Sequence, residues 1–448
     1  MRRYKNILLA AVAALIMTPA ALFAQSYGSI NTFSPYTMYG IGELSNQGSL
    51  TTRSMGGAGV ALRTPTEINY LNPASYSGMF NKSVLFSYGV EGSNYFNSQI
   101  RNGSKLSNSY AFLNIHDLAI QLPITKKMGM ALVIAPYSSA GYNISTSDNF
   151  SEIGLLSYNY EGGGDITHVK LGVGWEPFKN FSVGLSAQYY WGTIARSFTM
   201  EPYVVTGFGT YYSTMGESSY TVSKIKFQTG LQWSPISSMT RNLTFGLTYD
   251  LGGDLSPEYN HTVVGNGTLL SIVATNLTET LDLVLPNQIA AGVSYRNTKW
   301  LLGADYVYQN WLTGNGNFVE YTSSDLAVAY NDFSTYKVGA QYTPRRNDVR
   351  NYFNRVSYSA GFRYGGYQNT FGGNEISQYA ITAGVSFPLK MGGISKIDAG
   401  LEYGSRGDHS IVQTPTTSVG LIRQNYIKFS LAFTLFGEDY WFQRPKFD

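Results

Sequence analysis

The ionisable residues best placed to act on a solute lie on the polar faces of alternating segments. Six of them, each roughly seven to nine residues from a tight connection, are Lys170, Asp305, Lys337, Arg363, Glu402 and Lys428. Surplus cations in such a band would hold a substrate carboxylate or another polar solute, and Lys224 and Lys226 would extend the same face. Alternatively, the band pairs internally and with Arg53, Arg63 and Glu67, because a buried charge needs a partner.

The other polar residues form no catalytic, metal-binding or cofactor-binding pattern. The four histidines have no metal-ligand spacing, and the chain contains no Cys. His116 and His168 lie on predicted strands, but nothing selects a serine as the nucleophile of a lipase-like site. Gly56–Gly59 follows no predicted strand and lacks the Lys-Ser/Thr ending of a phosphate-binding loop. We therefore expect no enzyme, no metal site and no cofactor.

Long alternating strands between residues 83 and 436 must position the charged band. Every second residue from Phe181 to Trp191 is apolar, whereas the residues between them include Ser182, Ser186 and Gln188. This period of two suits a wall with lipid on one side and a polar lumen on the other. Roughly fourteen such strands, an even number behind a secretory signal, predict an all-β fold: a transmembrane antiparallel β-barrel in the outer membrane.

The connections between these strands alternate between tight and long, which orients the barrel. Tight turns belong to the periplasmic rim of such a barrel, and longer loops belong to the extracellular rim. The tight connections fall at Ile124–Lys127, Phe178–Asn180, Ile236–Arg241, Asn297–Thr298, Thr343–Phe353 and Leu389–Ser395.

Composition argues against other classes of protein. Arg2, Arg3 and Lys5 account for three of the 31 Lys and Arg residues, so 28 remain to balance 28 Asp and Glu residues after signal cleavage. A neutral mature chain has no electrostatic footprint for nucleic acid. A soluble β-sandwich or propeller would also alternate, but many strands exceed about ten residues and no blade-length repeat is present.

The two ends of the chain differ from the barrel. Residues 1–24 have a basic start, an apolar run and small residues, which predict a secretory signal peptide cleaved after Ala24 or Ala20. The barrel is expected to span residues 81–436. Residues 437–448 form a periplasmic tail with several aromatic residues. This tail is either an interfacial anchor or a docking peptide for a periplasmic or outer-membrane protein.

The segment between the signal peptide and the barrel lacks the alternating pattern. Residues 25–80 are rich in Gly, Ser, Thr, Asn and Pro. A barrel of about fourteen strands is too wide for side chains alone to fill it. We therefore expect residues 25–80 to fold in the lumen as a plug, with short helices near Ser54–Leu62 and Pro65–Asn69.

Three passages together resemble the FadL/TodX family of outer-membrane transporters for hydrophobic compounds. They are Arg53–Ala61 with Asn72–Ser75, Leu118–Thr125 with Met130–Tyr137, and Leu285–Tyr295 with Lys299–Trp311. The first is similar to the amino-terminal hatch of that family, and the other two are similar to its second hairpin and a late hairpin. The resemblance implies a fourteen-stranded barrel with a hatch domain. The residues expected in this plug are Arg53, Gly56, Gly57, Gly59, Arg63, Glu67, Asn72 and Pro73.

The resemblance also implies a route through the wall, because FadL-like transporters pass apolar substrates sideways at an inward kink of the third strand. Pro136 lies in the third predicted strand, and proline cannot donate to the ladder. Antiparallel register places Pro136 opposite about Gly164. Gly162, Gly163 and Gly164 would then weaken the neighbouring strand at the same height. We predict a lateral gap at these four residues, or alternatively a local bulge.

Two functions remain open. The first is a FadL-like channel for diffusion of small hydrophobic, fatty-acid-like molecules across the outer membrane of a Gram-negative cell, with lateral release. The alternative is a FadL-like barrel that serves as an interaction subunit of an outer-membrane protein secretion or assembly complex. Pro136 favours the first function, whereas the tail and the long mature start favour the second. In either case we expect contact with outer-membrane lipid and lipopolysaccharide.

Overall fold

The computed structural model describes residues 32–438, with gaps at 81–82, 102, 151–153, 204–212, 239, 256, 267–270, 281–282, 316–318, 322–325, 390–394 and 415–417. The predicted signal peptide, the first residues of the predicted plug and most of the predicted tail lie outside the described residues.

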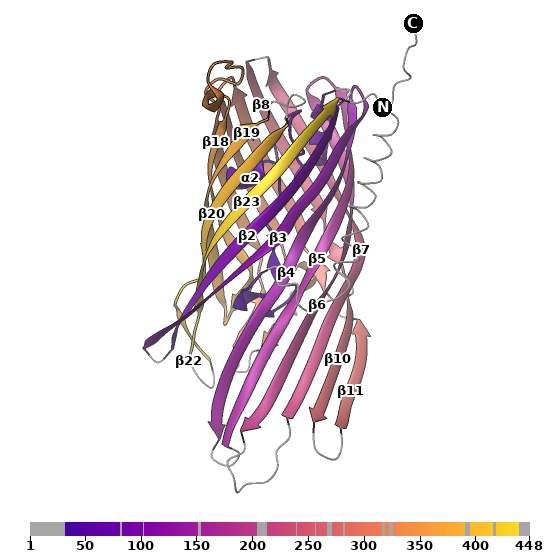
Figure 1. The fold of residues 1–448 in the computed structure, drawn as a ribbon. Helices are drawn as coiled ribbons and strands as arrows, with labels where there is room; N and C mark the ends of the chain where they lie inside the picture. Colours follow the sequence, from indigo (N-terminus) through magenta and orange to yellow (C-terminus); the bar gives the residue numbers. More distant parts are fainter. Residues whose placement is uncertain are drawn as a thin grey trace, which may run out of the picture.

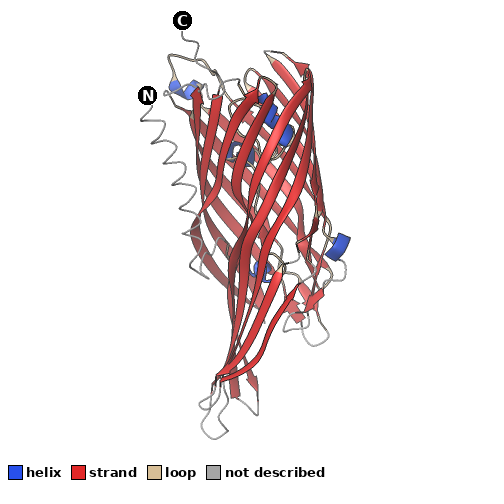
Figure 2. Cartoon of the chain, turned by 90° about the vertical axis from the view of Figure 1, so that its right-hand side faces the viewer, coloured by secondary structure: helices blue, strands red, loops and turns tan. Residues whose placement is uncertain are grey.

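The described chain forms a closed antiparallel β-barrel of 14 strands (Figures 1 and 2), which confirms the predicted fold. The continuous wall strands are β2 (Ser83–Arg101), β3 (Ser104–Thr125), β4 (Met128–Phe150), β5 (Gly154–Phe178), β6 (Phe181–Tyr203), β7 (Ser213–Ser237), β14 (Trp300–Asn310), β17 (Phe333–Tyr342), β18 (Ser357–Phe371), β19 (Asn374–Pro388), β20 (Lys396–Arg406) and β23 (Ile422–Glu438). Two wall strands are interrupted, and their parts are β8 (Arg241–Leu251) with β10 (Glu258–Asn266), and β11 (Ser271–Thr280) with β13 (Asn287–Asn297).

The barrel closes between its first and last strands. β2 pairs with β23 from Ser83 opposite Glu438 to Gln99 opposite Ile422. Short elements occupy the connections, namely β9 (Gly253–Asp254), β12 (Val284–Leu285), α3 (Leu312–Asn315), β15 (Val319–Tyr321), β16 (Ala327–Tyr330), η3 (Tyr352–Asn354), β21 (Ile411–Gln413) and β22 (Ser418–Gly420). Within the described residues, no helix is long and apolar enough to cross a membrane.

Side chains alternate across the wall as the sequence predicts. On β6, Leu185 is 55% exposed on the outer side, whereas Ser186 and Gln188 are buried on the lumenal side. Near the tight connections, Trp233 and Trp300 are exposed on the outside. Aromatic side chains of this kind are enriched at the membrane interfaces of outer-membrane barrels.

Residues 32–80 lie inside the barrel (indigo in Figure 1) and are called the lumenal segment below. Its elements are η1 (Pro35–Met38), β1 (Glu43–Leu44), α2 (Leu50–Ser54) and η2 (Pro73–Gly78). Glycines of the inner wall let its backbone approach closely. A Cβ at Gly184 would lie 2.3 Å from the Ala74 nitrogen, and a Cβ at Gly361 would lie 2.1 Å from the Gly56 nitrogen. The wall is therefore shaped to fit this segment.

The helices predicted within this segment are wrong. The described α-helix, Leu50–Ser54, ends where one was expected to begin, and Pro65–Asn69 forms turns and bends. Gly56 and Gly57 both have positive φ, at 72° and 87°, which ends the helix and turns the chain.

We expect Gly184→Val to destabilise the barrel by about 1–3 kcal/mol, because the added side chain would clash with backbone atoms that cannot rotate away. Thermal unfolding in detergent, together with trypsin cleavage within residues 32–80, measures the effect. Gly92→Ala is the control, since a Cβ there meets nothing closer than 3.7 Å. Equal stability and equal protease resistance of the two variants would contradict close docking at Gly184.

Candidate functional site

The ladder between β3 and β4 is much shorter than either strand. It runs from Thr125 opposite Met128 only to Leu118 opposite Ile134. Beyond that point β3 stays paired with β2 as far as Ser104, and β4 stays paired with β5 as far as Phe150. The two strand pairs diverge toward the rim with the long loops (Figure 1). We call this interruption the β3–β4 break.

Where β3 is no longer paired with β4, the lumenal segment covers the exposed edge of β4. β1 pairs with β4 through Glu43 opposite Ser139 and Leu44 opposite Ser138. On either side of β1, the Ser45 nitrogen donates to the Tyr137 oxygen at 2.8 Å, and the Ser34 nitrogen donates to the Gly141 oxygen at 2.8 Å. Backbone groups in the wall need hydrogen-bond partners, and here the lumenal segment supplies them.

The register predicted for Pro136 is wrong. Pro136 lies opposite Thr167, whereas Gly164 lies opposite Ala140, and the β4–β5 ladder is continuous across Gly162–Gly164. The hairpin turns later than expected, since Phe150 pairs with Gly154, and a bulge between Pro136 and Ser138 shifts the register. Pro136 instead lies at the break, on the edge of β4 that is turned away from β5. There the Gln47 side chain donates to the Pro136 carbonyl oxygen at 2.7 Å.

A cavity of about 60 Å³ lies directly behind the break. β3 contributes Ile115 and His116 to its lining, and β4 contributes Pro136 and Ser139. Two larger lumenal cavities, of about 110 and 150 Å³, share residues 45–46 with it. Residues 45–46, which follow β1, therefore border all three cavities.

Buried charges surround the cavity behind the break. Glu91 of β2 pairs with Arg53 of the lumenal segment and, at 3.1 Å, with Lys428 of β23. On the adjoining part of the wall, Arg363 of β18 donates to Glu402 of β20 at 2.7 Å. These opposite charges compensate one another, as buried charges must. A solute that enters here would meet apolar side chains, such as Leu44 and Ile115, beside these charges.

A family model described as BamG matches residues 4–448, nearly the whole chain. The chain belongs to the BamG family. No curated protein sequence matches it. Among solved structures, it is similar to a Pseudomonas aeruginosa FadL homologue (TM-score 0.59, 12% identity, 87% of this chain and 98% of that chain). It is also similar to the P. putida toluene transporter TodX (TM-score 0.56, 14% identity, 88% and 99%) and to the CymD monoaromatic hydrocarbon channel (0.55, 13%, 86% and 97%).

At these identities the likeness shows a shared fold: this BamG-family member has a FadL-like β-barrel fold.

Ion pairs hold the lumenal segment of this BamG-family barrel at several heights. Glu43 accepts from Arg406 at 2.7 Å, and Glu67 accepts from Lys396 at 2.7 Å. Burial by itself would raise the pKa of the Glu43 carboxyl, but the Arg406 guanidinium outweighs it and lowers this pKa below its ordinary value. Glu43 is therefore ionised, and β1 is tied to the wall by a charged hydrogen bond.

The six residues of the predicted band fall into three environments. Asp305 accepts hydrogen bonds from the Gly59 and Val60 nitrogens, at 2.6 and 2.9 Å. Arg363, Glu402 and Lys428 belong to the charges near the break. Lys170 and Lys337 line the 150 Å³ cavity. Some charges of the predicted band are therefore paired, whereas others line an open cavity of the same lumen.

The residues predicted for the plug all lie against the inner wall. Beyond the ion pairs of Arg53 and Glu67, Arg63 donates to Glu176 at 2.7 Å and the Asn72 side chain donates to the Leu231 oxygen at 3.1 Å. The Gly56 nitrogen donates to the Thr382 hydroxyl at 2.9 Å. A Cβ at Gly57 would contact Lys337, the Gly59 nitrogen donates to Asp305, and Pro73 faces Gly184.

Sequence reasoning missed Glu43, Glu91 and Arg406. Glu91 and Arg406 lie on lumen-facing positions of β2 and β20, so the alternating pattern could have marked them. No alternating pattern marks Glu43, because the lumenal segment has no regular spacing of apolar and polar residues. Among the described residues, no three His, Cys, Asp or Glu side chains are grouped to hold a metal ion.

We expect Glu43→Ala to loosen the first part of the lumenal segment, since it leaves the buried Arg406 guanidinium without its carboxylate. Removing one partner of such a pair costs about 3–5 kcal/mol. Hydrogen exchange of residues 32–47, followed by mass spectrometry, should accelerate. The double variant Glu43→Leu with Arg406→Leu should recover part of the protection, and unchanged exchange in Glu43→Ala would rule out this pair as an anchor.

Proposed function

We propose that this BamG-family barrel is an outer-membrane channel in which small molecules pass between the lumen and the bilayer at the β3–β4 break. The observation that carries the proposal is the end of the ladder at Leu118 and Ile134, with a lumenal cavity directly behind it. Between that cavity and the lipid, β3 and β4 are no longer paired with each other, and β1 covers the exposed edge of β4. Small hydrophobic, fatty-acid-like molecules are the proposed substrates, and the monoaromatic hydrocarbon and toluene channels that share this fold support a hydrophobic substrate.

The proposed route requires the lumenal segment to move. The three cavities are small, and residues 45–46 line all of them, so an elongated molecule cannot pass while β1 is paired with β4. The contact of β1 with Ser138 and Ser139 is short, at two residue pairs. We propose that β1 acts as the gate, and that the segment behind it stays docked through the Glu67 and Arg63 ion pairs.

A disulfide between Leu44→Cys and Ser138→Cys tests the gate, because these residues face each other in an antiparallel pair and the native chain has no Cys. We expect the oxidised protein to take up a radiolabelled medium-chain fatty acid several-fold more slowly than the reduced protein. Uptake is measured in cells whose sole copy of the protein is this variant.

The matched control joins Gln341→Cys to Ser359→Cys, a pair in a continuous ladder away from the break. This disulfide should leave uptake unchanged in both redox states. If the oxidised Leu44–Ser138 variant transports as fast as the reduced one, the lateral route past β1 is excluded.

A second function, that of an interaction subunit, is favoured by the free edge of β3. From Ser104 to Leu113 this strand pairs with β2 on one side and with no described strand on the other. Leu106 and Leu113 are 52% and 75% exposed. An exposed strand edge is a template for pairing with another chain. We infer that a β-strand of a partner protein at the outer membrane pairs with this edge, over roughly 33 Å.

The edge is tested with a photo-crosslinking amino acid placed in turn at Lys105, Ser107 and Ser109 of the full-length protein in cells. Pairing predicts adducts to one partner whose crosslinked positions also advance by two residues at each step. Tyr336, exposed in a fully paired region of the wall, is the control position. Adducts scattered over several proteins, or equal yields at Tyr336, would reject strand pairing. The tail predicted as a docking peptide lies outside the described residues.

A further inference from the structure

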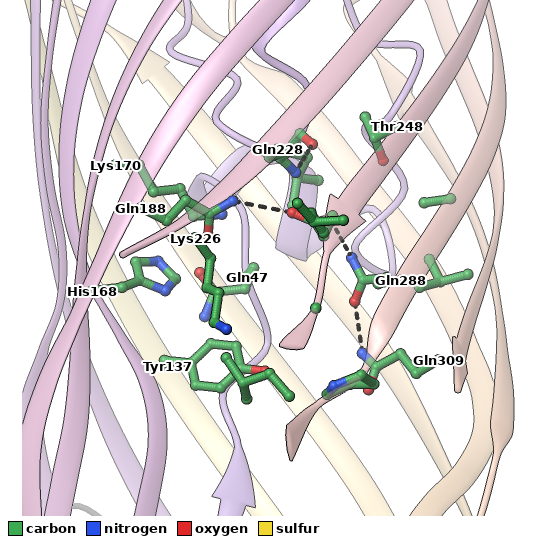
Figure 3. Close-up of a pocket in the computed structure, with 18 of the residues that line it drawn as sticks. Gln47, Tyr137, His168, Lys170, Gln188, Lys226, Gln228, Thr248, Gln288 and Gln309 are labelled. Carbon is green, nitrogen blue, oxygen red and sulfur yellow. Dashed lines mark hydrogen bonds between the residues drawn. The ribbon is translucent and has the colours of Figure 1, made fainter. Parts of the chain in front are cut away.

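A lumenal cavity of about 150 Å³ lies between the lumenal segment and the wall strands β4 to β8, β13, β14 and β17 (Figure 3). His168 and Lys170 point into it from β5, and Lys226 points into it from β7 (Figure 3). The side chain of Gln47 enters it from the lumenal segment. The cavity is therefore built by residues far apart in the sequence.

His168 is the unexplained group in this cavity. Its side chain is 1% exposed, and neither ring nitrogen has a hydrogen-bond partner among the described residues. The rings of Tyr137 and Tyr190 pack beside it, with centroids 5.8 and 5.5 Å away. A buried imidazole with both nitrogens unpaired costs several kcal/mol, so native proteins rarely keep one without a ligand or a water.

The carboxylate of the cavity already accepts hydrogen bonds from glutamine side chains. Gln188 donates to one oxygen of Asp250 at 3.1 Å, and Gln288 donates to the other at 3.0 Å. Gln309 in turn donates to Gln288 at 2.7 Å, so the amides form an ordered chain (dashed lines in Figure 3). Asp250 is thus the one carboxylate among the residues that line this cavity, and glutamines hold it in place.

The cations of the cavity remain in excess. Lys170 is 5% exposed and forms no hydrogen bond or ion pair within the described part of the chain. Lys226 donates to the Asp254 carbonyl at 2.7 Å and has further donors to offer. Lys337 also lines the cavity. Three ammonium groups thus face one carboxylate whose oxygens both accept from glutamines.

The size and the walls of the cavity limit what could balance these charges. A protein cavity of about 150 Å³ can hold a molecule as large as benzene. Tyr137 and Tyr190, in edge contact at 4.9 Å, supply a flat apolar side, and Val307 and Leu285 add aliphatic surface. A bare inorganic anion would leave these apolar walls without contacts.

We propose that this cavity binds a small organic carboxylate with a planar apolar body, its carboxylate held by Lys170, Lys226 and His168 and its body against Tyr137 and Tyr190. The site deepens the proposed transport function, because its cavity shares residues 45–46 with the cavity behind the β3–β4 break. The biological role of this site rests on the proposed transport function, whereas the binding of a carboxylate there does not.

Benzoate is the probe, and isothermal titration calorimetry of the full-length protein in an uncharged detergent is the measurement. We expect one benzoate per barrel, and at least about tenfold weaker binding of benzamide, which has nearly the same shape without the charge. Inorganic phosphate should also bind more weakly than benzoate. Equal affinity for benzoate and benzamide, or no benzoate binding because water alone fills the cavity, would overturn the proposal.

Substitutions locate the site. Lys170→Gln should weaken benzoate binding by about tenfold or more, since a charge-assisted hydrogen bond is lost. Lys179→Gln, at the tight connection that follows the same strand, should leave binding unchanged. His168→Phe should weaken binding and His168→Gln should restore part of it, which a purely structural role would not produce. Heat-modifiable migration on gels confirms that each variant is folded. Equal effects of Lys170→Gln and Lys179→Gln would refute the assignment.

The oxidised Leu44–Ser138 disulfide variant separates this proposal from the transport proposal. Benzoate binding in that variant should persist while fatty-acid uptake falls. If the disulfide slows fatty-acid uptake but benzoate does not bind, only the ligand assignment is refuted. If benzoate binds normally but the disulfide does not slow fatty-acid uptake, only the lateral route is refuted.

Discussion

Backbone hydrogen bonding in a membrane wall is the constraint on which this structure depends. A barrel removes unpaired strand edges by closing on itself, and this one closes through β2 and β23. Where β3 and β4 part, the constraint remains but is met differently. The lumenal segment takes over the edge of β4, through β1, Ser34 and Ser45. The segment is thus part of the wall as well as the filling of the lumen.

Buried charge and small residues explain why the lumenal segment stays in one place. Glu43, Arg53 and Glu67 each have an oppositely charged partner on the wall, at different heights in the barrel. Glycines of the wall let the two backbones touch, as at Gly184 and Gly361. A paired charge is costly to separate because each partner would remain buried alone. Movement of β1 is easier than release of the whole segment, since β1 contributes only two ladder pairs.

Much of the fold could be predicted from the sequence, but less of the site. The alternation from Phe181 to Trp191 predicted which side of β6 faces lipid, because a period of two is imposed by the strand itself. Pro136 marked an irregular strand, since a missing N–H can be read from one residue. Its partner could not be predicted, because a bulge and a late turn each shift the register. Glu43 was missed because its role depends on Arg406, more than 360 residues away.

The sequence by itself determined a membrane barrel of about fourteen strands and the lumenal positions of its charges. These follow from local periodicity and from the lengths of the connections, which need no knowledge of distant contacts. Only the tertiary structure decided which charges are paired, where the wall opens and where the lumen stays hollow. Those features arise where the lumenal segment meets strands such as β4, β5 and β20, and their geometry depends on register and close packing between residues hundreds of positions apart.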